Sequence, residues 1–134
     1  MTAETVEHVD LELWLCGRLR PALTTWAPLV DRRFPAPSWV PGFAVVVRDD
    51  SGPDQSMVTA ARSVGVTVIG PDGTHQQTAQ LAQRVAALLR LSYEPPSPVA
   101  TCERVRGPYS LAAVGRVEFY LSADLVVVGQ SVTL

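Results

Sequence analysis

The sequence contains no lysine and no asparagine, and its single isoleucine is Ile69. The codons of these residues are rich in A and T, so their scarcity indicates a G+C-rich coding source and has no functional meaning. Long apolar runs are also missing: runs such as Val45 to Val47 and Leu125 to Val128 fall far short of the ~20 residues that a membrane span needs. The first ten residues carry acids and no basic cluster, so we expect neither a signal peptide nor a membrane partner.

Charge is scarce. Charged residues make up 18% of the 134-residue chain, against roughly 25% in a typical soluble domain. From Gln55 to Gln83, only Arg62 and Asp72 carry a full charge. The net charge of −2 excludes a generally basic nucleic-acid binder. A charge-poor surface favours a subunit of an assembly, and the alternative is a small domain rich in Val and Ala with an uncharged polar surface.

Catalytic and metal-binding motifs are missing as well. The chain has no GxGxxG, HExxH or GxSxG sequence and no phosphate-binding loop of the GxxxxGKS or GxxxxGKT type. Cys16 and Cys102 form no CxxC motif or Cys/His cluster, which excludes zinc and thioredoxin-type sites. His8 falls on the polar side of the first expected helix and His75 in the first turn of the second, so both are expected to face solvent. The sequence therefore predicts no catalytic residue and no cofactor.

The order of periodic segments predicts a single α+β domain over residues 1–134. An N-terminal helix is expected over about residues 5–20, ended by Pro21, and a proline-rich loop over residues 35–41. A second helix is expected over Thr74 to Leu91, begun by a capping box of Thr74 and Gln77. Its expected buried stripe is Leu81, Val85, Leu88 and Leu89.

Four strands are predicted from β-branched runs and turn residues: Phe43 to Arg48, Met57 to Ile69, Val99 to Arg106 and Gly115 to Val128. The last has the cleanest alternation, with apolar residues on one face and polar residues from Arg116 to Asp124 on the other. The expected fold is a mainly antiparallel four-stranded sheet with an N-terminal helix and one helix between the two hairpins, in the order α-β-β-α-β-β.

Several polar or aromatic groups are candidates for an interface with another protein: Trp39 in the proline-rich loop; Arg48, Asp49, Asp50 and Asp54 around the first hairpin; Gln76, Gln80 and Gln83 on the second helix; and Arg104, Arg106, Arg116, Glu118 and Tyr120 on the last two strands. The acidic turn could instead bind a hard cation, but its spacing fits no EF-hand loop. The arginines are a weak nucleic-acid signal, for which ion pairs with Glu103 and Glu118 are the simpler account. Trp39 either pins its loop to the core or docks on a neighbour.

Three stretches of sequence then resemble a known family. They are FAVVVRDDSGPD, TVIGPDGTHQQTAQLAQRVAALL and RVRGPYSLAAVGRVEFYLSADLVVVG, and together they are similar to the tail terminator (tail completion) proteins of long-tailed bacteriophages. The shared pattern includes Thr74, Thr78, Leu81 and Ala82 of an Ala-rich helix, Gly107-Pro108 in the following hairpin, and Arg116 opening the last strand. The likeness covers roughly Phe43 to Gly129.

The resemblance implies a virion protein that forms a ring, usually of six copies, on the head-proximal end of the tail tube. Such a ring stops polymerisation of the major tail protein, offers a surface to the neck proteins of the head, and lets DNA pass through its lumen. Two alternatives remain: a neighbouring head–tail connector (neck) ring protein, or a small enzyme or ligand-binding domain. A protein that caps purified tail tubes but does not bind heads alone would be a terminator and not a neck ring protein. A deep polar pocket with a buried, charge-shifted His or carboxylate would favour the enzyme or ligand-binding domain.

Overall fold

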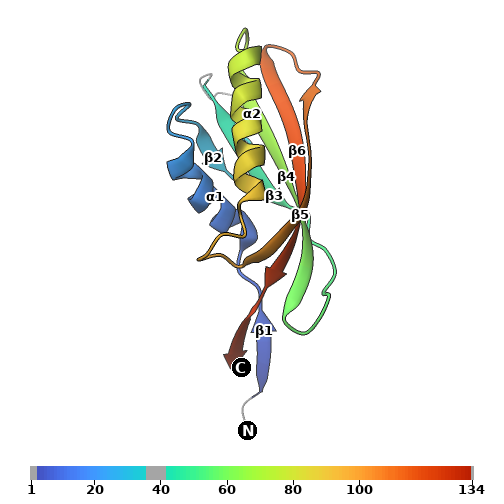
Figure 1. Cartoon of the computed structure of the whole chain (residues 1–134). Helices are drawn as coiled ribbons and strands as arrows, with labels where there is room; N and C mark the ends of the chain where they lie inside the picture. The colour runs from blue at the N-terminus through green and yellow to red at the C-terminus, as the bar shows by residue number, and fades with distance from the viewer. Residues whose placement is uncertain (1–2, 36–41, 134) are drawn as a thin grey trace.

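The computed structural model describes residues 3–35 and 42–133 (Figure 1). The elements are β1 (Glu4–Glu7), α1 (Leu11–Ala22), β2 (Leu29–Asp31), β3 (Ala44–Asp49), β4 (Thr59–Pro71), α2 (His75–Arg90), β5 (Val99–Leu111), β6 (Arg116–Val128) and β7 (Gln130–Thr133). Five strands form one sheet in the order β2-β3-β4-β6-β5, and β1 and β7 form a separate two-stranded ribbon. Neighbouring strands are antiparallel except β2, which runs parallel to β3.

The expected four-stranded antiparallel sheet is therefore wrong. Within the described residues the chain is α+β, with two helices and seven strands divided between a mixed five-stranded sheet and the ribbon. The four predicted strands are present as β3, β4, β5 and β6, but β5 runs on to Leu111. The unpredicted strands are short, and each obtains its hydrogen-bond partner from a segment that local sequence does not reveal.

The first half of the expected N-terminal helix is also wrong. Residues 4–7 are extended because β7 pairs with them, Glu4 lying opposite Thr133 and Glu7 opposite Gln130. The helix begins only after Asp10, whose side chain accepts a hydrogen bond from the backbone N–H of Leu13 at 3.1 Å. It then continues through Pro21 to Ala22, and because Pro21 has no N–H to donate to the preceding turn, the helix ends one residue later.

Helices α1 and α2 cover the same face of the five-stranded sheet, as Figure 1 shows. On α2, the predicted burial of Leu81, Val85 and Leu89 is confirmed, and Leu88 is half-buried against the same core. The alternation of β6 is confirmed over Arg116 to Leu125: the apolar side chains face the helices, and the polar residues face away. We call the sheet surface that points away from the helices the open face.

The predicted capping box of α2 does not form. The hydroxyl of Thr74 donates to the carbonyl of Pro71 at 2.5 Å, and no side chain caps the first turn. Thr78, which is buried, donates its hydroxyl to the carbonyl of Thr74 at 2.8 Å. These two threonines lie so close to β4 that a Cβ at Gly70 would overlap the hydroxyl of Thr78. The glycine at this strand end therefore allows the helix to start directly against the sheet.

Candidate assembly surfaces

Tyr120 lies near the centre of the open face. The strand register places it opposite Thr67 on β4 and opposite Tyr109 on β5. Its hydroxyl lies over Gly65, where a Cβ would come within 2.6 Å of it. Because Gly65 has no side chain, the phenol ring of Tyr120 can lie directly over β4 at this point.

Arg48 and Asp50 border this tyrosine. The Nε of Arg48 lies 2.7 Å from Oδ1 of Asp50, and this hydrogen bond, followed by the attraction of the carboxylate, raises the pKa of Arg48. Arg48, Tyr120 and Phe34 line a cavity of about 290 Å³ on the open face. Two of the predicted interface residues, Arg48 and Tyr120, are thus brought together with an exposed aromatic ring.

A second charged group lies along β5 and β6. Arg104 and Arg106 both approach Oδ2 of Asp124, at 3.7 Å and 2.9 Å. The expected pairing of these arginines with Glu103 is therefore wrong, because the register places Arg104 directly opposite Asp124. Two guanidinium groups thus share one carboxylate, while Glu103 on the same strand is exposed and pairs with neither of them.

The expected pairing of Arg116 with Glu118 is confirmed. Their side chains lie 2.6 Å apart between Nη2 and Oε1, and only 13% of the Glu118 side chain is exposed. The geometry is that of an ion pair without a hydrogen bond, since Oε1 is buried and has no hydrogen-bond partner among the described residues. Arg116 thus neutralises a carboxylate that β6 holds close to the apolar Ile69 of β4.

The three aspartates of the first hairpin do not converge on one point. Asp50 pairs with Arg48, and Asp54 is exposed where it bridges Ala60. Asp49 is half-buried: its carboxylate accepts from the N–H of Ser51 at 2.7 Å. Across residues 3–35 and 42–133, no cluster of three or more His, Cys, Asp or Glu side chains could hold a metal ion. The acidic turn is therefore built from local hydrogen bonds and ion pairs.

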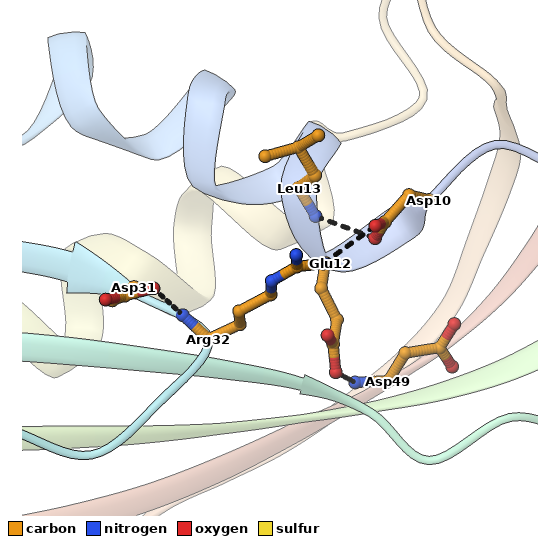
Figure 2. A network of polar contacts seen from close by, with 6 residues as sticks. All are labelled: Asp10, Glu12, Leu13, Asp31, Arg32 and Asp49. Atoms are coloured by element: carbon orange, nitrogen blue, oxygen red, sulfur yellow. Dashed lines mark hydrogen bonds and ion pairs between the residues drawn. The ribbon is translucent and has the colours of Figure 1, made fainter.

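A polar network that sequence reasoning missed holds the neighbouring end of the sheet (Figure 2). The N–H of Asp49 donates to Oε2 of Glu12 at 2.8 Å, and Nη1 of Arg32 lies 2.8 Å from Oδ2 of Asp10. These contacts tie the first turn of α1 to the ends of β2 and β3. An Asp just before an apolar helical run is the sequence signal that marks Asp10 as a helix N-cap.

The outward face of α2 carries the predicted glutamine surface. Gln76, Gln80 and Gln83 are exposed and line a groove of about 560 Å³ together with Trp26 and Arg84. The guanidinium of Arg84 lies 5.5 Å from the centre of a Trp26 ring, within the range of a cation–π contact. Trp26 was not anticipated in this surface, because it comes from the α1–β2 connection and only the fold brings it beside α2.

The remaining predicted residues have separate environments. Trp39 lies outside the described residues. His75 is exposed, as expected, whereas His8 lies between β1 and α1 with a buried Nδ1 that has no hydrogen-bond partner within the described chain. Burial raises the pKa of the Cys16 thiol and of the Cys102 thiol, so both remain protonated around neutral pH.

Among the described helices, none is both long enough and apolar enough to cross a membrane. No protein-family model matches this chain, and no curated protein matches it either.

Proposed function

We propose that this protein is a tail terminator of a long-tailed bacteriophage. Copies of the chain form a ring, with six as the expected number, on the head-proximal end of the tail tube. The ring stops addition of the major tail protein, presents a surface to the neck proteins and lets DNA pass. The proposal rests on the sequence resemblance over roughly Phe43 to Gly129 together with the arrangement of surfaces in the fold.

The observation that carries the proposal is a pair of unlike surfaces on opposite sides of one thin domain. The glutamine surface lies on the exposed side of α2. Arg48, Tyr120 and Phe34 lie on the open face of the sheet, on the side away from the helices. A ring is built from one repeated contact between two different patches, so it requires such a pair on each subunit. Tyrosine and arginine are enriched in protein interfaces, and an uncharged amide costs less to bury there than a charged side chain.

The charge of the chain agrees with a DNA conduit. The net charge is −2, and a ring of such subunits is acidic overall. A strongly basic lumen would bind phosphates by releasing their counterions and would slow the passage of DNA. An acidic ring avoids this retention.

Electron microscopy of the purified protein mixed with tail tubes tests the proposal. A ring seated on one end of each tube, with tubes no longer extended by added major tail protein, is the expected result. Gln80→Arg places a bulky charge in the groove and is expected to prevent the ring, while Gln77→Arg on the same helix, outside the groove lining, leaves it intact. Binding to heads without capping of tubes would assign the protein to the neck ring instead, and binding to neither would reject both.

A further inference from the structure

The β1–β7 ribbon projects beyond the end of the five-stranded sheet (Figure 1). Its two strands pair with each other over four residues each, and neither packs extensively against any other helix or strand. Glu4, Glu7, Gln130 and Thr133 are all exposed. A two-stranded ribbon is marginally stable on its own, so a ribbon held out from the domain gains stability when further strands or surfaces are added to it.

Strand β5 is the long free edge of the main sheet. It pairs with β6 on one side, and within the described residues no strand pairs with its other side over its 13 residues. Its outward backbone N–H and C=O groups are a template for another strand, interrupted at three register shifts and at Pro108, which has no N–H. The opposite edge, β2, has only three residues and offers far less backbone.

Charge distinguishes the two features. The ribbon carries Glu4 and Glu7, neither of which has an ion-pair partner among the described residues, and its β7 strand is uncharged. On β5, Arg104 and Arg106 share the single carboxylate of Asp124 and are themselves 64% and 44% exposed. Glu103, also exposed on β5, offsets part of this charge, so the complementarity is local: two carboxylates of the ribbon without ion-pair partners in the described part of the chain can meet two exposed guanidinium groups, and both features offer unpaired strand backbone.

The ribbon leaves the domain at the end of β6 and points away from its own β5 (Figure 1). We propose that the β1–β7 ribbon is an assembly arm that adds to the free edge of β5 in a second copy of this chain. This inference rests on the proposed ring and supplies one of its subunit contacts. Because the arm and its acceptor are different surfaces of one chain, the contact repeats head to tail, as ring closure requires.

A charge swap between subunits tests this contact. Two variants reverse one side each: Glu4→Arg with Glu7→Arg on the arm, and Arg104→Glu with Arg106→Glu on the edge. Each alone is expected to weaken self-association on the order of tenfold, measured by analytical ultracentrifugation and native mass spectrometry. Mixing the two restores assembly, because each basic arm then meets an acidic edge and each acidic arm meets a basic edge, and the restored particles contain the two variants in equal numbers.

A matched control reverses two acidic residues elsewhere. Asp72→Arg with Glu94→Arg makes the same change in net charge as the arm variant and is expected to leave association unchanged. Both residues are exposed and lie outside the ribbon and β5. Thermal unfolding by circular dichroism shows whether each variant is folded, and the single change Arg104→Glu replaces the double edge variant should the latter unfold.

The outcomes separate this inference from the proposed function. Unchanged association of the arm variant, or no restoration on mixing, overturns the assembly arm. If the wild-type chain and all variants cap tail tubes equally, the arm is rejected and the terminator function stands. If the wild-type chain assembles through the arm but never caps a tube, the function is rejected and the arm stands. A chain that remains monomeric both alone and with tubes rejects both.

Discussion

Asp10 and Arg32 are 22 residues apart in the sequence, but their side chains meet at 2.8 Å (Figure 2). The other carboxylate oxygen of Asp10 accepts from the N–H of Leu13, so one side chain both caps α1 and joins it to the end of β2. The hydrogen bond from Leu13 is the main cause that lowers the pKa of Asp10, with a further contribution from Arg32. In its ionised form, this carboxylate therefore joins the start of α1 to the end of β2.

Replacing Asp10 by Ala is expected to cost about 1 kcal/mol of unfolding free energy at pH 7, the usual cost of losing an N-cap. Asp10→Asn retains a cap but loses the charge, so it is expected to cost less. Because the pKa of Asp10 is lowered in the folded state from 3.8, the stabilisation is complete above pH 3.8 and is lost as the pH falls through the folded-state value. Urea unfolding of the three proteins at a series of pH values measures this. A constant difference between wild type and Asp10→Asn down to the lowest pH would contradict the role of the charge.

The core side of α2 gives a second prediction. Leu81 is completely buried between α2 and the sheet, so Leu81→Ala is expected to cost about 2–4 kcal/mol through lost burial and a cavity. Leu88 is only half-buried, and its replacement by Ala is expected to cost clearly less. Gln77→Ala, on the exposed side of the same helix, is the control and should change stability by less than about 0.5 kcal/mol. Equal costs for Leu81→Ala and Gln77→Ala, measured from urea midpoints, would contradict this packing.

The elements that could be predicted carry their signal within their own length. Helix α2 has an apolar stripe and β6 a strict alternation, and both patterns are locally complete. The ribbon could not be predicted in this way, because β1 becomes a strand only through pairing with β7 at the far end of the chain. Val6 and Val9 also fit the helical stripe of the residues that follow, so a longer helix was the better local interpretation. Strand β2 has three residues, too few for any period to be visible.

The same distinction holds for the candidate surfaces. Arg116 and Glu118 are two residues apart on one strand and therefore share a face, which predicts their pairing. The contact of Arg106 with Asp124 depends instead on the register of β5 against β6, which shifts at three points along β5. Trp26 joins the glutamine surface only because the α1–β2 connection lies beside α2. Local sequence patterns therefore identify a surface that lies on one helix or strand. A surface that two elements form together can be identified only when the fold is known.

Gly65 and Tyr120 give a third prediction, in the form of a double-mutant cycle. A Cβ at Gly65 would lie 2.6 Å from the Tyr120 hydroxyl, so Gly65→Ala must displace the phenol and is expected to cost on the order of 1 kcal/mol. In a Tyr120→Phe background the hydroxyl is gone, and the same glycine substitution is expected to cost less. Thermal or urea unfolding of the four proteins gives the coupling. Strict additivity would show that the hydroxyl is not what the glycine accommodates.

The fourth prediction compares two arginines on the open face. Arg116→Ala leaves the Glu118 carboxylate, 13% exposed, without its counter-ion and is expected to cost about 1–3 kcal/mol. Arg104 is 64% exposed and 3.7 Å from Asp124, which retains Arg106, so Arg104→Ala is expected to cost less than about 0.5 kcal/mol.

The test for Arg116 is rescue by removing the charge that it neutralises. Adding Glu118→Gln to Arg116→Ala is expected to recover part of the lost stability, because an amide is cheaper to bury alone than a carboxylate. Urea unfolding of the single and double variants measures the recovery. No recovery, or equal effects of Arg116→Ala and Arg104→Ala, would show that the Glu118 carboxylate is satisfied without Arg116. In that case Arg116 would be free for a contact with another subunit.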